Sequence, residues 1–497
     1  MNEILVILPA VVALVMIVVT RQAALSLLSA LIVGVMLQHK GDVMGGGKAL
    51  VVDYLFPALS GSWHIGPILF TLILGAFAQV LERSGGFVSV MQWLIGEREG
   101  GARRKTLLGV YGMGLICFFD GLANAILVGS VARPFTEGMR VSRQLLAYLI
   151  DSTSSAVACI AFISTWIATQ LSLINDGVAG VSMGLSSAEL YFRSIPANPY
   201  CWLVLVLLFV VIWRSWWIGP MRRYQGVAEG EEFERGEELE GAAAWRVVVP
   251  LLSILVTIPG VIYMWQDGGE RSWQNAFSST HVPEAMVAGA LVSLVVACVC
   301  FPKKGILGRV MLEGAASLLP ALVILIFAWS LGAVFKDLEV AVILSGMLGG
   351  SVPVVWLPLV VFLVGSLTSF LTGSSWGTMG ILMPIVLPLG VEMLGADGDF
   401  IRVVPMLIGA VFGGAVFGDN CSPFSDTTIV TSLATGCSPS SHVSSQLPYA
   451  LLAAGGATVS YGVMALGAAA WVATLIGAVL LVVVSMVWGS RGQESGV

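Results

Sequence analysis

The sequence predicts an all-α polytopic membrane protein of about 10–12 transmembrane segments, arranged as two inverted repeats with re-entrant hairpins and broken transmembrane helices. The first observation is composition. The 497 residues are 57% hydrophobic and 11% charged, whereas a soluble domain has about 25% charged residues. The second is length, since apolar runs such as WVATLIGAVLLVVVSMVW are long enough to cross a bilayer. The third is a hairpin followed by a broken helix, an order of elements that occurs twice.

Composition and motif spacing exclude several classes of function. There is no basic stripe with interleaved aromatics, so we expect no nucleic-acid partner. The GGGK stretch fails as a phosphate loop, because Asp42 and Ala49 stand where glycine and serine or threonine are required. The four histidines have no metal-ligand spacing, and GCSPSSH before Val443 is not an arrangement that we identify as catalytic. We therefore predict a protein that is not an enzyme and has no cofactor.

An acidic segment divides the chain. Tyr224–Ala243 contains seven glutamates and one arginine, and such a charge block is typical of a solvated linker. Arginines flank the segment on both sides, which places it in the cytoplasm by the positive-inside rule. The start MNEILVILPAVVALVMIVVT lacks a basic region and a cleavage site, so we expect a retained first helix. The predicted parts are a first transmembrane half at 1–223, the linker at 224–243 and a second half at 244–497.

A re-entrant hairpin is predicted at about residues 106–132. Basic residues lie on both sides of this apolar run, in GARRK and in RPFTEGMRVSR, so a single crossing would leave one basic cluster outside the cell. The stretch FFDGLAN in the middle suits a hairpin tip, with Gly121 to bend and Asp120 and Asn124 as polar groups. Unwound backbone at this depth must be buried in protein or line a cavity.

The second half has a similar hairpin at about residues 353–390, which is predicted to enter from the opposite face. Its flanks, FKDLEV and VEMLGADGDF, are poor in lysine and arginine, so we place them outside the cytoplasm. Its tip, TGSSWG, supplies hydroxyl groups from Thr372, Ser374 and Ser375. The two halves therefore have opposite predicted topologies.

A broken helix is predicted after each hairpin, at about 145–172 and at about 403–436. In both, an apolar segment is followed by an aspartate and then by serines and threonines: Asp151 opens DSTSS, and Asp419 opens DNCSPFSDTT. Inverted repeats with discontinuous helices near the midplane are a recurrent design of secondary transporters. The alternative is that small residues merely let helices pack closely, which does not account for carboxylates inside the membrane.

Four carboxylates fall within the predicted membrane segments, where each costs roughly 2.5–3.5 kcal/mol on insertion scales. One explanation is an ion pair with a distant base such as Lys336 or Arg402, and a second is hydrogen bonding to the end of a broken helix. The third, which we favour, is the binding of an ion or a proton. The four residues are Asp120, Asp151, Asp419 and Asp426.

The polar clusters offer what a sodium site needs. Na⁺ is a hard cation that takes oxygen ligands from carboxylates, hydroxyls and carbonyls, and breaks in helices free backbone carbonyls. A carboxylate that binds either a proton or Na⁺ couples the two flows, and we expect Na⁺ ligands at Asp419, Asp426 and Asp151. The candidate ion- or substrate-binding residues are Asp419, Asn420, Ser422, Ser425, Asp426, Thr427, Asp120, Asn124, Asp151, Ser152, Thr372, Ser374 and Ser375.

Several motifs resemble the NhaC-type sodium/proton antiporter family: TGSSWGTMGILMPIVLPL, GDNCSPFSDTTIVTS, HVSSQLPYALL and, in the first half, FFDGLANAILVGSVARPF. The resemblance covers most of the chain outside the termini and the acidic linker. It implies the two-repeat fold of the wider ion-transporter superfamily, Na⁺-coupled transport, and residence in the lipid bilayer of a bacterial inner membrane. Members of that superfamily are often dimers, so the resemblance also implies a homodimer.

Two departures from the family pattern bear on the transported solute. The family commonly has DDYAN at the first hairpin tip, whereas Gly121 replaces the second acid here. The family often has CDHIDHV after the second broken helix, whereas CSPSSHV keeps His442 and lacks both acids. The resemblance implies a secondary active transporter that exchanges sodium for protons. The missing acids favour, as the alternative, a Na⁺-coupled transporter of an amino acid or small organic acid.

Overall fold

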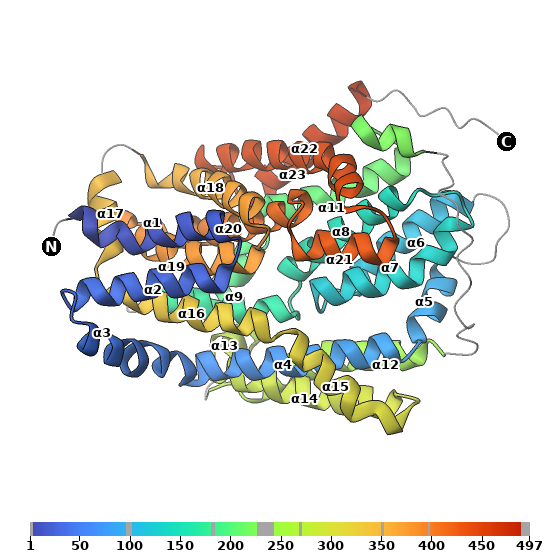
Figure 1. Ribbon diagram of the computed structural model, residues 1–497. Coiled ribbons are helices and arrows are strands. Elements are labelled where there is room, and N and C mark those ends of the chain that lie inside the picture. The colour runs from blue at the N-terminus through green and yellow to red at the C-terminus, as the bar shows by residue number, and fades with distance from the viewer. Residues whose placement is uncertain are drawn as a thin grey trace.

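The computed structural model describes residues 3–95, 102–179, 184–225, 243–267, 271–348, 352–395 and 398–488. Within these ranges every regular element is a helix (Figure 1). Among the described residues, ten helical stretches are long and apolar enough to cross a membrane, or up to 11 if a bent pair forms one span. The predicted all-α, multi-pass membrane fold is therefore confirmed.

The helices of the first half are mostly shorter than those of the second. A first group precedes the predicted hairpin, the next four helices cover the hairpin and broken helix, and two more complete the half. Their bounds are α1 (Glu3–Thr20), α2 (Ala23–Gln38), α3 (Val43–Ala49), α4 (Ser62–Arg83), α5 (Gly86–Ile95), α6 (Ala102–Ile116), α7 (Gly121–Glu137), α8 (Arg143–Ile160), α9 (Thr165–Gly177), α10 (Ser187–Ser194) and α11 (Pro199–Arg214).

The second half repeats this order of elements with longer helices. A group of six helices precedes the predicted hairpin and broken helix, and two long helices close the chain. Their bounds are α12 (Trp245–Met264), α13 (Trp273–Ser278), α14 (Val282–Cys300), α15 (Leu307–Ser317), α16 (Leu319–Asp337), α17 (Val340–Leu348), α18 (Leu357–Thr372), α19 (Ser375–Leu394), α20 (Phe400–Cys421), α21 (Asp426–Thr435), α22 (Pro439–Ala465) and α23 (Ala470–Val487).

One layer of helices packs beside the part of the protein that contains the predicted hairpins. Helices α4, α12, α14 and α15 pack against one another and form the lower layer in Figure 1. The pairs α6–α7 and α18–α19 approach the centre of the body from its two opposite sides (Figure 1). Helix α9 contacts both α4 and α19, so it connects the layer to the centre where the predicted hairpin tips lie.

The turns at the two predicted hairpin tips have specific local causes. The Asp120 side chain accepts a hydrogen bond from the Ala123 backbone N–H at 2.8 Å and so caps the start of α7. Helix α18 is followed directly by its cap residue Gly373, whose φ of 67° lies in the left-handed region that glycine adopts without a steric cost. Ser374 then caps α19 by accepting a hydrogen bond from Gly377 N–H at 3.1 Å.

The two predicted broken helices also show their breaks. Helices α8 and α9 are bent by 44° at a short gap, and Ser164 caps α9 by accepting from two backbone N–H groups. Helix α20 ends at Cys421 and α21 begins at Asp426, with Pro423 in the gap. Proline lacks a backbone N–H, so it cannot continue the ladder of helical hydrogen bonds.

The structure leaves parts of the predicted organisation untested. The inverted relation of the two halves, and the entry of the hairpins from opposite faces of the membrane, stay predictions. The acidic linker at 224–243 lies almost wholly outside the described residues, which omit 226–242.

The hairpins predicted at about 106–132 and 353–390 fall on α6–α7 and α18–α19. The broken helices predicted at about 145–172 and 403–436 fall on α8–α9 and α20–α21.

Candidate functional site

The first predicted hairpin tip is tied to the break between α8 and α9. Thr165 N–H donates to the Phe119 carbonyl at 2.9 Å, and the Thr165 hydroxyl donates to Asp120 Oδ2 at 2.7 Å. The Ala123 backbone N–H donates to Asp120 Oδ1, so both carboxylate oxygens of Asp120 accept hydrogen bonds. Asp120 therefore fits the second explanation for an intramembrane carboxylate, hydrogen bonding to the end of a broken helix. Its side chain caps the start of α7 and also accepts a hydrogen bond from Thr165 at the start of α9.

The second cluster surrounds the end of α20. Asp419 is 2% exposed, and its Oδ1 accepts a hydrogen bond from the Ser425 hydroxyl at 3.2 Å. Ser425 Oγ also lies 2.9 Å from Thr427 Oγ1. Asp419 Oδ2 is buried and has no hydrogen-bond partner within the described residues. The hydroxyls of Ser155 on α8 and Ser375 on α19 face this carboxylate, so oxygen atoms from two helices and from the gap between α20 and α21 surround it.

Asp151 lies in the middle of α8 and is fully buried. Its Oδ2 accepts a hydrogen bond from Gln446 Nε2 at 2.5 Å, whereas its Oδ1 has no partner among the described residues. Its backbone carbonyl accepts a hydrogen bond from Asn420 Nδ2 at 3.2 Å. The two predicted broken helices are therefore joined beside their aspartates, and Asp151 and Asp419 interact electrostatically.

A cavity of about 150 Å³ brings the predicted hairpin tips and broken helices together. Three of the four intramembrane carboxylates line it, those of Asp120, Asp419 and Asp426. Asp426 is exposed and lies at the edge of the cavity, whereas the other two are buried. The opposite wall comes from the junction of α15 and α16, around Pro320 and Ile324. Trp166 and Trp376 also line the cavity, with ring centroids 5.9 Å apart. The predicted residues that line the cavity are Asp120, Ser374, Ser375, Asp419, Asp426 and Thr427.

The other predicted site residues lie outside this cavity lining. Asn124 donates to the Gly114 and Cys117 carbonyls, which are free at the end of α6. Thr372 and Ser422 accept backbone hydrogen bonds within their own turns. Ser152 and Asn420 line a small pocket beside Tyr200 on α11. These contacts hold the helix breaks in place.

Among the described residues, no lysine or arginine forms an ion pair with the four site carboxylates, and the basic group nearest to one of them is His442 Nε2, at 3.9 Å from Asp151 Oδ2. Lys336 lines a different cavity, and Arg402 donates a hydrogen bond to the Met464 carbonyl. Within the described ranges, no group of three or more His, Cys, Asp or Glu side chains could hold a metal ion. Asp151, Asp419 and Asp426 therefore do not form a three-carboxylate cluster, and a cation at Asp419 would need hydroxyl ligands as well.

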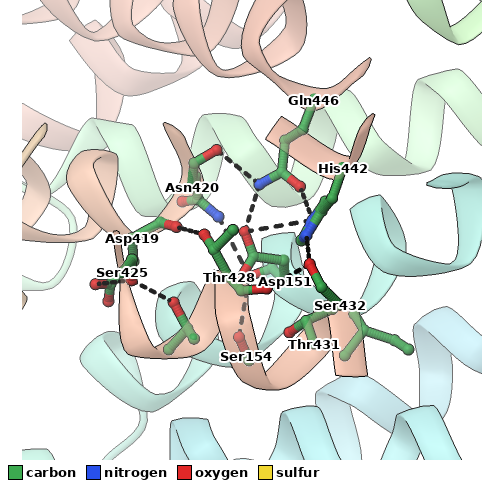
Figure 2. A network of polar contacts seen from close by, with 12 residues as sticks. Asp151, Ser154, Asp419, Asn420, Ser425, Thr428, Thr431, Ser432, His442 and Gln446 are labelled. Carbon is green, nitrogen blue, oxygen red and sulfur yellow. Dashed lines mark hydrogen bonds and ion pairs between the residues drawn. The ribbon is translucent and has the colours of Figure 1, made fainter. Parts of the chain in front are cut away.

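A buried polar chain leads from Asp151 to α22 (Figure 2). Gln446 Oε1 lies 2.7 Å from His442 Nε2, and His442 Nδ1 lies 3.1 Å from Ser432 Oγ. His442 and Gln446 were not among the predicted site residues. Their spacing of four residues places both on one face of a helix, a signal present in HVSSQ that does not reveal which helix they meet.

A second cavity, of about 400 Å³, is larger, and three of the helices that line it also line the first cavity. It is lined by α9, α16 and α19 near their C-terminal ends and by His64 at the start of α4. His64 Nε2 lies 3.0 Å from Asp176 Oδ2, and the His64 ring stacks on Trp329 at 4.3 Å. Lys336 also lines the cavity, so it offers both acidic and basic groups.

Comparison with known proteins agrees with this arrangement. An uncharacterized protein of Haemophilus influenzae is 28% identical over 499 residues, which cover 96% of this chain and 94% of that protein. The malate-2H(+)/Na(+)-lactate antiporter of Bacillus subtilis is 35% identical over 89 residues, or 18% of each chain. An uncharacterized Na(+)/H(+) antiporter of Haemophilus influenzae is 36% identical over 78 residues, which are 16% of this chain and 15% of that protein.

Two solved structures share the fold. The YdaH transporter of Alcanivorax borkumensis has a TM-score of 0.57 at 17% identity, covering 86% of this chain and 90% of that one. MtrF of Neisseria gonorrhoeae has a TM-score of 0.55 at 14% identity, covering 89% and 85%. The model of the Na+/H+ antiporter family matches residues 157–466, which include the end of α8 from residue 157, all of α9 and all of α18–α21. The chain therefore belongs to the Na+/H+ antiporter family.

Proposed function

We propose that the protein exchanges Na⁺ for protons across the membrane, with Asp419 as the group for which the two ions compete. The observation that carries the proposal is Asp419 Oδ2. It belongs to a buried carboxylate that lines the cavity, and it has no hydrogen-bond partner within the described residues. A buried carboxylate charge is costly when no opposite charge balances it. Binding either a proton or a cation removes that cost, and the two cannot occupy the same oxygen together.

The groups around Asp419 suit a small hard cation. Ser425, Thr427 and Ser375 supply hydroxyl oxygens near the carboxylate, and Asp426 adds a second carboxylate at the cavity edge. Na⁺ accepts such oxygen ligands readily. In this proposal the site opens alternately to the two sides of a bacterial inner membrane. The acidic linker lies in the cytoplasm, and two copies of the chain form a dimer.

The proposed exchange predicts a direct response in inverted membrane vesicles that carry a pH-sensitive dye. Once respiration has acidified the vesicle interior, Na⁺ added outside should enter in exchange for internal protons, and the rise in internal pH should restore dye fluorescence. Vesicles from cells without the protein provide the control. If neither Na⁺ nor Li⁺ moves protons, the exchange proposal is wrong.

A second candidate function is Na⁺-coupled transport of a small carboxylate or amino acid. The observation in its favour is the cavity of about 400 Å³, whose Lys336 and His64 could face a carboxylate and whose Asp176 could face an amine. The name of the Bacillus subtilis relative also includes malate and lactate. Na⁺ uptake that requires an organic solute and moves no protons would select this function over the first.

A further inference from the structure

The two cavities follow one another along the same helices. The smaller one, of about 150 Å³, is lined by Asp419 and is called the Asp419 cavity below. On α16, Ile324 lines the Asp419 cavity and Ala328 lines the larger cavity. Residues four apart lie on one face of a helix, and four residues rise by about 6 Å. The two linings on α16 are therefore about one helical turn apart on the same face.

A close contact between α16 and α19 separates the two cavities. On α19, Trp376 lines the Asp419 cavity and Pro384 lines the larger one. Gly380 lies midway between them on the same face of the helix. A methyl group at residue 380 would lie 3.1 Å from Ala328 Cβ and 3.7 Å from Ile324 Cγ2. Because glycine has no such group, the backbone of α19 packs directly against α16 at the level between the cavities.

Helix α19 also has two carbonyls that lack the usual helical donor along this face. A proline has no backbone N–H, so Pro384 cannot donate to the carbonyl of Gly380, four residues before it. Pro388 likewise cannot donate to the carbonyl of Pro384. Both prolines line the larger cavity. Carbonyl oxygens are ligands that a hard cation accepts, so α19 offers such ligands from the larger cavity to the level of Gly380.

Helix α9 places a hydroxyl at the same level. Trp166 lines the Asp419 cavity and Leu173 lines the larger one. Thr169 lies three residues after the first and four before the second, which places it on the same helix face. Its side chain is 2% exposed, and its hydroxyl has no hydrogen-bond partner within the described residues. A buried hydroxyl without a partner is costly, and a passing cation would supply one.

The larger cavity favours cations over anions. The charged side chains among its described lining residues are those of Asp176, Glu339, Glu392 and Lys336, and His64 lies beside Asp176. The three carboxylates outnumber the basic groups even when His64 is protonated, and an acidic cleft raises the local concentration of cations. Glu339 and Glu392 are exposed. They belong to the segments FKDLEV and VEMLGADGDF, which are predicted to lie outside the cytoplasm.

We propose that the larger cavity is the extracytoplasmic vestibule through which Na⁺ reaches Asp419, and that the contact of Gly380 with α16 is the barrier between them. When α16 and α19 separate at this contact, Na⁺ moves past the Thr169 hydroxyl and the Gly380 carbonyl to the Asp419 carboxylate. When the contact closes, the site is free to open toward the cytoplasm. The inference rests on the proposed exchange, in which Na⁺ and a proton compete at Asp419, and assigns its outer route.

Blocking the vestibule from outside tests the route. Ala333 lines the larger cavity and is exposed. Cells that produce full-length Ala333→Cys are treated with a membrane-impermeant, positively charged methanethiosulfonate before inverted vesicles are prepared. We expect Na⁺-driven proton movement to become slower by about tenfold or more, because the attached charge repels Na⁺ from the vestibule. A negatively charged methanethiosulfonate of similar size should slow it much less.

Gly346→Cys is the matched control. Residue 346 is exposed on α17, is not among the cavity lining, and has no atom within 4 Å of an added Cβ, so its modification should leave exchange unchanged. Treated wild type controls for the seven native cysteines. Mass spectrometry measures the modified fraction. If Ala333→Cys is not modified from outside, or is fully modified and exchanges normally, the vestibule is overturned. If untreated wild type moves no protons in response to Na⁺, the proposed exchange itself fails, which is a separate result.

A reversible cross-link tests the barrier. In the double variant Ala328→Cys/Gly380→Cys the two sulfur-bearing Cβ atoms face each other at close to the separation of a disulfide. Oxidation should stop Na⁺-driven proton movement, and reduction with dithiothreitol should restore it. Each single variant should be insensitive to the oxidant. Normal exchange in fully cross-linked protein would overturn the assignment of Gly380 as the barrier.

Discussion

Asp419→Asn will abolish Na⁺-driven proton movement in inverted vesicles. The amide keeps the size of the side chain but can neither lose a proton nor present a negative charge to Na⁺. Removing the charged ligand should weaken Na⁺ binding on the order of 100-fold, which corresponds to about 2.7 kcal/mol. The measurements are dye recovery in vesicles and ²²Na⁺ binding to the purified variant, each normalised to the amount of folded protein.

Asp426→Asn is the comparison that makes the Asp419 prediction specific. Asp426 lines the same cavity but lies at its edge, where its side chain is more exposed than that of Asp419. Water can replace part of its contribution to a bound cation, so we expect a loss of about tenfold or less. If Asp426→Asn abolishes exchange while Asp419→Asn retains it, the assignment of the central carboxylate is wrong.

Gly418→Ala will destabilise the protein and impair transport together. A methyl group at residue 418 would lie 1.9 Å from Ser369 Oγ and 2.4 Å from the Ser369 carbonyl carbon, so α18 would have to move away from α20. Overpacking of this kind costs about 1–3 kcal/mol and occasionally more. Because Asp419 is the next residue, the same displacement would shift the proposed cation ligand. We expect a lower temperature of thermal unfolding in detergent and slower Na⁺-driven proton movement.

Gly462→Ala provides the matched control for this prediction. Gly462 lies in α22, and a methyl group there would meet no atom within 4 Å. Alanine also favours a helix over glycine by about 1 kcal/mol, so this variant should unfold at the wild-type temperature or slightly above it. Equal effects of the two substitutions would show that the contact between α18 and α20 is not what makes Gly418 necessary.

The sequence predicted the elements of the site better than the packing between them. Asp120 was assigned from a polar hairpin tip within an apolar run, and Asp419 from an aspartate that opens a hydroxyl-rich stretch, and the structure brings both to one cavity. That pattern is local in the chain, because a cap such as Asp120 to Ala123 joins residues three positions apart. Helix breaks with polar caps inside apolar runs therefore leave a clear trace in the sequence.

Contacts between distant helices were not predictable in the same way. Gln446 meets Asp151 across 295 positions of the chain, and no property of either residue alone identifies the other. The wall around Pro320 and Ile324 is apolar, so it resembles any lipid-facing helix until the packing is known. Asn124 stays a predicted ligand. Its amide nitrogen donates to two carbonyls at the end of α6, a structural role that composition cannot separate from ion binding.

The most direct test of the proposed exchange is ²²Na⁺ uptake into proteoliposomes that contain the purified protein and no organic solute. With an acidic interior and an alkaline exterior, the account predicts that Na⁺ accumulates inside as protons leave. Collapse of the pH gradient with ammonium, or the Asp419→Asn substitution, should reduce uptake to the level of empty liposomes. Na⁺ uptake that ignores the pH gradient, or that begins only when an amino acid or small organic acid is added, would contradict the exchange of Na⁺ for protons.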